Sequence, residues 1–211
     1  MSRFILPITE YNRVYQVIHG VLLGIPEANA ENACTFFATF GAYILKREYG
    51  IDARVVAGAF SFAMSDADGI AFFGKIENDQ LVSADDAFHM WVQTKTHVFD
   101  FMAPIYREAF AASPGAALLP RKMMQRCLED EAPSLDGLRQ AGDFRCHPNP
   151  DLTQELLEHF YHRQLNTDLL GVALTWYGEA RARQASTFAM ADENGAVTYL
   201  ALANTTANGA W

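Results

Sequence analysis

The chain changes at Gly50 from a sequence typical of a buried helix to one typical of strands. Residues 33–49 carry apolar side chains on almost every face of a helix, which indicates a helix covered by neighbours on all sides. Lys46 and Arg47 suit the negative end of the helix dipole, and Gly50 is a natural stop. Beyond it, ARVVAGAFSFAM and IAFFGKI flank the turn cluster SDADG, so residues 53–76 predict a hairpin. A buried helix next to an antiparallel hairpin indicates an α+β fold.

The segment before the buried helix predicts another, amphipathic helix. Apolar side chains recur at helical spacing over residues 10–22, so we expect this helix to pack on the core. The loop GIPEANAEN then separates the two helices, and Asn29 or Asn32 is a candidate cap for the second. The apolar positions of the first helix are Tyr11, Val14, Tyr15, Ile18 and Leu22.

The second half of the chain predicts mostly scaffold. Residues 111–150 are rich in Pro and Gly and predict a long irregular connection with one short helical run, RKMMQRCLED. We expect Asp151 to cap a helix to about Gln164, and Thr167 or Asp168 to open another through LLGVALTWYGEARAR. STFAMADENGAVTYLALAN predicts a hairpin about an Asn-Gly turn that extends the central sheet, and the tail TTANGAW is expected to fray. The buried side of the last helix is expected to hold Leu169, Leu170, Ala173, Trp176 and Tyr177.

Size and charge limit the number of domains and the kinds of partner. At 211 residues, of which 50% are hydrophobic and 19% charged, the chain predicts a single domain over 1–211, with helices plus a terminal hairpin in 151–211. The formal net charge of -9, with only 16 Lys and Arg, argues against a nucleic-acid binder. Such proteins cluster cations to replace phosphate counterions. Nucleic acid is therefore not an expected partner, and the oligomeric state is left open.

The N-terminal residues and the cysteines indicate a compartment. Pro7, Glu10 and Asn12 interrupt any apolar run long enough for a signal sequence or a membrane span. We therefore expect a cytoplasmic protein with no membrane partner. Cysteines stand only at positions 34, 127 and 146, too few and too far apart for a disulfide framework, so free thiols are expected.

The segment FHMWVQTKTHVFDF predicts a second hairpin, and its register brings two polar side chains together. If Thr94 and Lys95 are the central residues of a tight turn, paired residues have numbers that add to 189, and His89 lies opposite Asp100. Directly opposed β-carbons lie roughly 4.5–5.5 Å apart, so the imidazole and the carboxylate can hydrogen-bond. A four-residue loop keeps this pairing, whereas a loop of odd length puts the two on opposite faces.

The two faces of this hairpin are expected to differ. One face carries apolar side chains that belong to a core, together with His97, which we interpret as structural. His89 and Asp100 stand on the other face, which we expect to have fewer apolar neighbours. Trp91 is predicted to belong to the core or to form a wall of the cleft, and not to be a platform for a ligand. The apolar face consists of Phe88, Met90, Val92, Phe99 and Phe101.

Cys34 opens the predicted buried helix, and this position favours a reactive thiol. A thiolate is the nucleophilic form of cysteine, and both a helix N-terminus and a neighbouring imidazolium favour it. Taken alone, a cysteine in an apolar helix is most often inert, but His89 and Asp100 in register supply a base and a group that orients the base. The backbone N–H of Cys34 can stabilise an oxyanion. For the second, side-chain donor the candidates are Asn29, Asn32 and Gln16, and the sequence leaves the choice open.

These motifs together resemble a known enzyme core. The motifs are, in chain order, a Cys that opens a buried helix, GIDARVVAG, HMWV, a short turn and an Asp on the next strand. In this order they resemble the catalytic core of the transglutaminase-like and papain-like cysteine enzymes, over residues 31–104. The resemblance implies a papain-like fold with Cys34 as nucleophile, His89 as general base and Asp100 as orienting acid. Thr35 departs from the pattern, because many members carry an aromatic residue there. Small, uncharacterised bacterial families share this kind of core.

The resemblance implies acyl transfer from an amide, peptide or ester bond to Cys34, and then to water or an amine. Hydrolysis is the expected outcome, with a peptide, a protein or a small amide as substrate and with no cofactor and no metal. The alternative, from a different class of function, is a catalytically inactive protein of the same fold that binds a peptide or a partner. Ionisation of Cys34 at neutral pH distinguishes the two, since a binding module has no use for a thiolate.

A structural zinc site is a further, less favoured hypothesis. Cys146, His147, His159 and His162 are possible ligands, but they stand in a Pro-broken loop and an amphipathic helix instead of paired knuckles. The aspartates at 66, 68, 85 and 86 are interpreted as solvated turn residues, since a metal loop needs more oxygen ligands at closer spacing.

Overall fold

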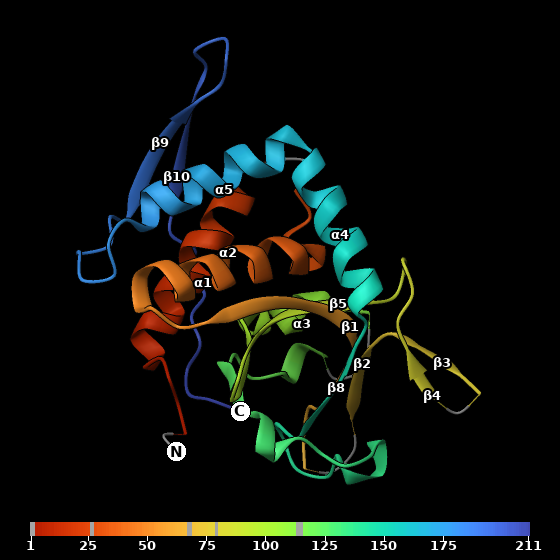
Figure 1. Ribbon diagram of the computed structural model, residues 1–211. Coiled ribbons are helices and arrows are strands. Elements are labelled where there is room, and N and C mark those ends of the chain that lie inside the picture. Colours follow the sequence, from red (N-terminus) through yellow and green to blue (C-terminus); the bar gives the residue numbers. More distant parts are fainter. Residues whose placement is uncertain (1–2, 26–27, 67–68, 79, 113–115) are drawn as a thin grey trace.

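A computed structural model of the chain describes residues 3–25, 28–66, 69–78, 80–112 and 116–211. The long helices lie over one face of a curled antiparallel sheet, so the fold is α+β as predicted (Figure 1). The helices are α1 (Ile8–Leu23), α2 (Cys34–Tyr49), α3 (Tyr106–Ala109), α4 (Pro150–His162) and α5 (Gln164–Tyr177). The strands are β1 (Ala53–Ala63), β2 (Ile70–Phe73), β3 (Lys75–Glu77), β4 (Gln80–Val82), β5 (His89–Thr94), β6 (His97–Asp100), β7 (Met124–Cys127), β8 (Phe144–Pro148), β9 (Thr187–Ala191) and β10 (Val197–Ala201).

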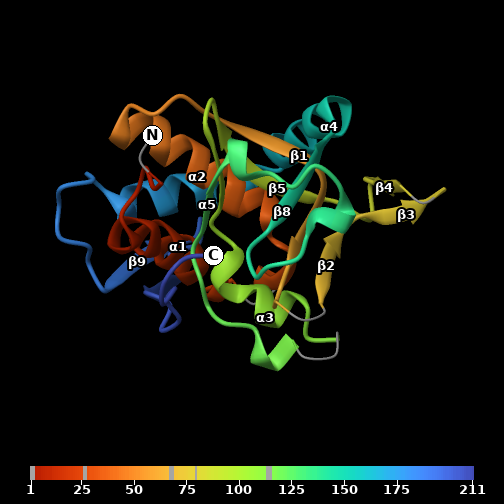
Figure 2. The same cartoon turned by 90° about the horizontal axis from the view of Figure 1, so that it is seen from below.

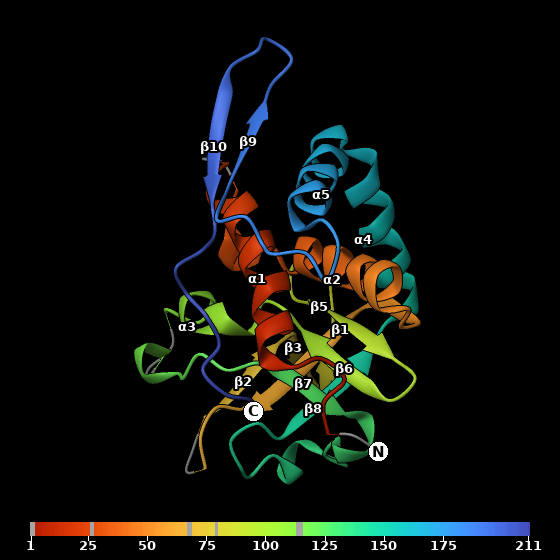
Figure 3. The same ribbon diagram turned by 90° about the vertical axis from the view of Figure 1, so that its left-hand side faces the viewer.

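Helix α2 lies between the sheet and α5, which explains its nearly all-round apolar sequence (Figure 3). It ends at Gly50, whose φ of 64° is left-handed and whose N–H bonds to the carbonyl of Leu45. At its start Ala33 is the N-cap, and no side chain caps the helix. The prediction that Asn29 or Asn32 caps α2 is therefore wrong. A short 3₁₀ turn, Ala30–Asn32, leads into the helix instead.

Strand β1 is the centre of the main sheet, whose order is β2-β1-β5-β6-β7. The first half of β1 pairs with β5, and its second half pairs with β2 and β8. The change falls at Gly58, which lies opposite His89 on β5 and opposite Pro148 on β8. A β-carbon at Gly58 would lie 2.0 Å from the carbonyl oxygen of His147, so only glycine permits the close approach of β8.

The predicted irregular connection over 111–150 contains two strands of the main sheet. The run RKMMQRCLED was expected to be helical, but Met124–Cys127 of this run form β7, which pairs with β6, and only Leu128–Asp130 form a 3₁₀ turn. Strand β8, Phe144–Pro148, pairs with β1. The free edges of β1 and β6 offer backbone hydrogen bonds to these segments, and that tertiary requirement overrides local propensity.

The last sixty residues correct the prediction in several details. Helix α4 begins at Pro150, and its cap is Asn149, which accepts from the N–H of Leu152 at 3.1 Å, in place of Asp151. Helix α5 already begins at Gln164 and ends before Gly178, so the predicted start at Thr167 or Asp168 is too late. Its predicted buried residues Leu169, Leu170, Ala173, Trp176 and Tyr177 are buried.

The C-terminal hairpin does not extend the central sheet, and the tail is ordered, so both predictions for this part of the chain are wrong. Strands β9 and β10 pair only with each other in a separate sheet, which projects from the body as an arm next to α5 (Figures 1 and 3). The tail does not fray. Asn12 and Ala207 exchange two hydrogen bonds of 3.0 and 2.8 Å, and Trp211 is 3% exposed.

Two apolar clusters lie on opposite faces of the sheet. The larger contains residues from both ends of the chain, from Leu6 to Ala207, and fills the space between the helices and the sheet. The smaller surrounds Trp91 and Phe60 on the other face and includes Trp211. Within the described ranges, no helix is long and apolar enough to cross a membrane.

Candidate active site

His89 and Asp100 form the hydrogen bond that the sequence predicts, but in a different register. The Nε2 of His89 lies 2.5 Å from the Oδ2 of Asp100. Val92 pairs with Phe99, so the numbers of paired residues add to 191 and not to 189. His89 and Asp100 are therefore diagonal neighbours on one face, a separation that long side chains can bridge.

The two-residue shift has a local cause in the turn. The Oγ1 of Thr94 accepts from the N–H groups of Thr96 and His97 at 3.2 and 2.9 Å. This side-chain turn makes Lys95 and Thr96 the central residues, in place of Thr94 and Lys95. Because side chains alternate with a period of two, a shift by two residues keeps His89 and Asp100 on the same face.

Asp100 is buried, and each oxygen of its carboxylate has a donor. Oδ1 accepts from the N–H of Met102 at 2.8 Å, and Oδ2 accepts from the Tyr106 hydroxyl as well as from His89. Tyr11 donates its hydroxyl to the main-chain carbonyl of Asp100. A buried carboxylate with this many donors is held in one orientation.

The Asp100 carboxylate raises the pKa of His89. Burial alone would lower the pKa of His89, but the charge of Asp100, the hydrogen bond to it and a hydrogen bond with Cys34 outweigh the burial and raise the pKa from 6.5 to about 10. Nε2 faces Asp100, which leaves Nδ1 for the thiol. The ring of Phe73 stacks on the imidazole at 4.0 Å between centroids and 20° between planes, which fixes its orientation further.

The face that carries His89 is more apolar than predicted. Phe60, Phe73 and Tyr106 all place their rings within 6.3 Å of the imidazole centroid. The expectation of few apolar neighbours is therefore wrong. Because the sheet curls, its own strands β8 and β2 cover this face together with α3. The aromatic surroundings exclude water from the hydrogen bond between His89 and Asp100, and this exclusion strengthens the bond.

Cys34 and His89 line one pocket. Cys34 is the first residue of α2 and is 7% exposed, and the pocket has a volume of about 470 Å³. The β3–β4 hairpin, which follows β2, projects sideways from the body (Figures 1 and 2). The pocket is lined by Glu31, Asn32, Cys34, Phe72, Phe73, Gly74, Asp85, Asp86, Ala87, Phe88, His89, Met102, Ala109 and Phe110.

The three candidate oxyanion donors separate in the structure. Asn32 lines the pocket with Cys34, whereas Asn29 lines the two neighbouring pockets beside α2 and α1. Gln16 is wrong as a candidate, because its amide donates to the carbonyl of Ala203 at 2.7 Å and packs against the C-terminal segment. Of the two places predicted for Trp91, the core is confirmed and the cleft wall is wrong, since Trp91 is 0% exposed and belongs to the core cluster around Phe60.

Sequence reasoning missed Tyr106, Phe73, Asp85 and Asp86. Tyr106 stands in the apolar run FMAPIY, where its hydroxyl is the only side-chain hydrogen-bonding group, and this was the one available signal. Asp85 and Asp86 were interpreted as solvated turn residues, and both line the pocket. Asp68, considered with them, lies outside the described residues.

The residues of the zinc hypothesis do not converge. Cys146 is buried in the cluster around Trp91, and burial together with Glu131 raises the pKa of its thiol well above the ordinary value. His159 and His162 line different pockets on two sides of α4. Within the described ranges, no group of three or more His, Cys, Asp or Glu side chains could hold a metal ion.

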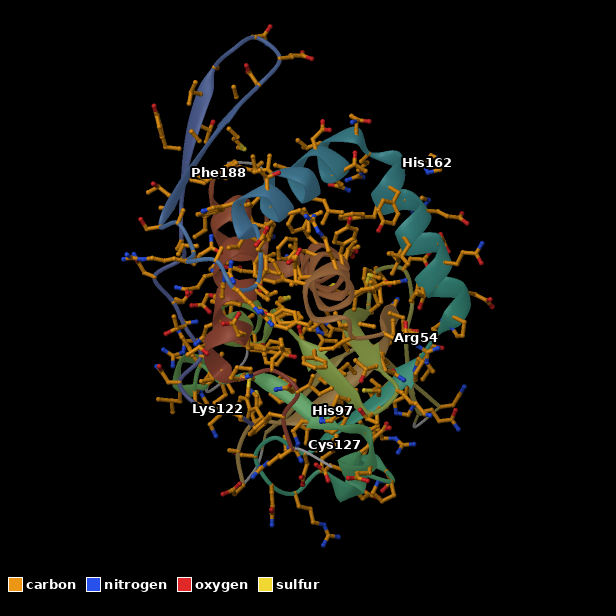
Figure 4. The ribbon with its side chains drawn as sticks, turned by 60° about the vertical axis from the view of Figure 1, so that its left-hand side comes forward. Arg54, His97, Lys122, Cys127, His162 and Phe188 are labelled. Atoms are coloured by element: carbon orange, nitrogen blue, oxygen red, sulfur yellow. The ribbon has the colours of Figure 1, made fainter. Side chains whose placement is uncertain are left out.

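A second Cys–His contact lies within the sheet. His97 and Cys127 are direct partners on β6 and β7, with 3.3 Å between Nε2 and Sγ (Figure 4). The Nδ1 of His97 lies 2.8 Å from the Thr96 hydroxyl. His97 is 2% exposed, so its interpretation as a buried structural residue agrees with its position.

Comparison with known proteins adds a family and a solved relative. Residues 7–211 match the model of a family described as "Protein of unknown function (DUF2026)". No curated protein matches the chain. A solved structure, "The crystal structure of genomics APC5867", is 28% identical in sequence with a TM-score of 0.84, over 100% of this chain and 98% of that one. Since the family model covers nearly the whole sequence, the chain belongs to the DUF2026 family.

Proposed function

We propose that the protein is a cysteine-dependent hydrolase or acyltransferase that acts on amide, peptide or ester bonds through Cys34, His89 and Asp100. The observation that carries the proposal is the shared pocket of Cys34 and His89, with the imidazole backed by the buried carboxylate of Asp100. A thiol at a helix start beside an imidazolium is favoured as thiolate, which is the attacking form.

Each residue has one part in the proposed reaction. The Sγ of Cys34 attacks the carbonyl carbon, and the protonated His89 gives its proton to the leaving amine or alcohol as the bond to it breaks. Water, or an amine acceptor, then attacks the thioester while His89 takes its proton, and the thiolate leaves. Asp100 holds the imidazole and stabilises its charged form throughout.

The N-terminus of α2 is the proposed oxyanion site. The first N–H groups of a helix have no intrahelical partner, so the N–H of Cys34 is the backbone donor we propose for the oxyanion. Asn32 is the side-chain donor we propose, because it is the only one of the three candidates that lines the Cys34 pocket.

The proposal includes a relationship to papain-like and transglutaminase-like enzymes. It is supported by a cysteine at the start of a buried helix, by a histidine and an aspartate on neighbouring antiparallel strands, and by their contact. We also propose a cytoplasmic location, in keeping with three cysteines that form no disulfide.

The pH dependence of iodoacetamide labelling at Cys34, read by mass spectrometry, tests the proposal. We expect labelling well below pH 8.5, the ordinary midpoint of a cysteine thiol, and at least a tenfold loss of rate at pH 6 in His89→Gln. His97→Gln is the matched control, since it removes the other buried histidine that contacts a cysteine and leaves the pocket unchanged. Circular dichroism of each variant establishes that it is folded.

Two outcomes would contradict the proposal. If Cys34 is not labelled, or if His89→Gln and His97→Gln label Cys34 equally fast, the thiol is not activated by His89. The protein would then be better described as a catalytically inactive member of the fold that binds a peptide or a partner.

A further inference from the structure

Carboxylates surround the entrance of the Cys34 pocket. Glu31 precedes the cysteine by three residues, and Asp85 and Asp86 approach from the turn before β5. All three side chains belong to exposed residues. The described residues that line the pocket include no lysine or arginine, so His89 is its only cationic group.

One of the three carboxylates already has a cation. Asp86 binds the ammonium of Lys75 on β3 at 2.6 Å. Among the described residues, neither Glu31 nor Asp85 takes part in an ion pair. Lys75 also interacts electrostatically with Asp85, but one ammonium cannot balance three carboxylates, so the entrance keeps a net negative charge.

The walls of the pocket also favour a cation on an apolar stem. Phe72, Phe73, Phe88 and Phe110 line it, and Phe72 is 40% exposed although it is a large apolar side chain. Aromatic faces attract ammonium and guanidinium groups and pack against the methylene chains that carry them. The aromatic lining and the carboxylates are separate features, and both point to the same kind of ligand.

We propose, building on the cysteine chemistry above, that the cleft selects amide substrates carrying an ammonium or guanidinium group next to the scissile bond. Glu31 and Asp85 are the specificity residues, and the phenyl rings receive the stem of the group. The His89 imidazolium has the opposite preference, because it attracts anions toward the thiol. The preference for cations therefore depends on the two carboxylates and is not a general property of a Cys–His pair.

Small thiol reagents of matched shape and opposite charge test this selection without a known substrate. Aminoethyl methanethiosulfonate is cationic, sulfonatoethyl methanethiosulfonate is anionic and methyl methanethiosulfonate is neutral. In each case the Cys34 thiolate attacks the sulfenyl sulfur, a disulfide forms and methanesulfinate leaves. We would measure the three labelling rates at Cys34 by mass spectrometry. Each is divided by the rate of the same reagent with N-acetylcysteine, which corrects for differences in intrinsic reactivity between the reagents.

The comparison uses one double variant and one matched control. Glu31→Gln/Asp85→Asn removes the two unpaired carboxylates of the cleft. Glu129→Gln/Glu155→Gln removes two exposed carboxylates that line none of the main pockets of the described chain, and it changes the net charge by the same amount. A unit charge about 6 Å away changes a rate about threefold in water and about 1.8-fold once salt screens it. Each removed carboxylate slows the cation and speeds the anion, so we expect the cation-to-anion ratio to fall about tenfold in the cleft variant, which loses two, and to change little in the control.

The outcomes separate the selectivity from the chemistry. Fast, His89-dependent labelling by the neutral reagent with no excess of the cationic over the anionic rate would overturn the selectivity and leave the proposed function intact. An equal fall of the ratio in both double variants would also overturn it, because the effect would then come from net charge alone. Slow labelling by all three reagents would overturn the proposed function together with the selectivity.

Discussion

The described part of the chain contains two Cys–His contacts, Cys34–His89 and Cys127–His97, which differ in the second partner of the histidine and in the surroundings of the cysteine. His89 is bonded to the carboxylate of Asp100, whereas the second partner of His97 is the hydroxyl of Thr96. Cys34 begins a helix and lines a pocket, whereas Cys127 lies within strand β7, and neither it nor His97 lines one of the main pockets of the described chain. Contact between a thiol and an imidazole is thus common to both pairs and does not by itself make a site.

The difference shows which features turn a contact into candidate chemistry. Desolvation favours neutral imidazole, so a buried histidine needs a charged partner to hold a proton. Asp100 supplies that charge to His89 in an interior where water does not screen it. The helix N-terminus adds an electric field that favours a thiolate, and the pocket gives room for a substrate.

Asp100→Asn should have the largest effect on Cys34 labelling. It removes the carboxylate that contacts His89, so the Cys34–His89 pair comes to resemble the Cys127–His97 pair. Without the carboxylate the imidazole loses the charge that keeps it protonated, and the labelling rate of Cys34 at pH 6 should fall by about 100-fold. The matched control is Thr96→Val, which removes the polar partner of His97 and should leave the rate at Cys34 unchanged. Equal rates in the parent and in Asp100→Asn would show that the carboxylate is structural.

The pH dependence of stability should also distinguish the Cys34–His89 pair from the Cys127–His97 pair. The pKa of His89 is raised from 6.5 to about 10, so the folded state binds this proton more tightly than the unfolded state. The stabilisation is complete below about pH 6.5 and is lost as the pH rises through 10. The free energy of unfolding should therefore fall by up to about 1.4 kcal/mol per pH unit in this window.

Urea unfolding between pH 6 and 10 measures this slope in the parent and in His89→Gln. The variant should lose most of the fall, since it has no imidazole to release a proton. A parent and a variant with parallel pH profiles would mean that the slope comes from other groups that titrate in this range.

Two tyrosines that both bond to Asp100 separate positioning of the site from general stability. Tyr106 donates to the carboxylate, and Tyr11 donates to the main-chain carbonyl of the same residue. Tyr106→Phe removes one buried hydrogen bond, and Tyr11→Phe removes the one to Asp100 together with a long one of 3.4 Å that the Tyr11 hydroxyl accepts from the N–H of Met124. Each variant should cost about 1–2 kcal/mol of unfolding free energy. Only Tyr106→Phe should slow Cys34 labelling, by about threefold to tenfold, and move its onset to higher pH. Equal slowing in both variants would contradict this positioning role for Tyr106.

The smallest effect is expected from adding a carboxylate to the Cys127–His97 pair. Thr96→Asp places a carboxylate next to the Nδ1 of His97, where the hydroxyl now lies. Cys127 lies within strand β7 and lines none of the main pockets of the described residues, so its labelling rate should change less than twofold. A large increase, read on the Cys127 peptide, would show that the carboxylate alone is sufficient and would remove the distinction drawn between the two pairs.

Local patterns in the sequence were enough to predict several features of the fold and the site. The two N-terminal helices, the end of α2 at Gly50 and the C-terminal hairpin at 187–201 follow from periodicity and turn residues. The hairpin predicted over 53–76 is confirmed up to Phe73, whereas Lys75–Glu77 form β3 and pair with β4 instead. The hydrogen bond between His89 and Asp100 was also predictable, although the assumed register was off by two residues. Alternation along a strand has a period of two, so an even error leaves both side chains on one face.

Only the tertiary structure decided what surrounds that hydrogen bond. Strands β7 and β8 form because open sheet edges need backbone partners, and neither segment has a strong strand pattern. The contact of Tyr106 with Asp100 and the place of Asp85 in the cleft depend on how distant segments pack. Sequence therefore determined the elements, the helix-start cysteine and the shared face of His89 and Asp100, because these depend on spacing along the chain. The tertiary structure alone determined the walls and charge of the cleft, because these depend on contacts that spacing does not encode.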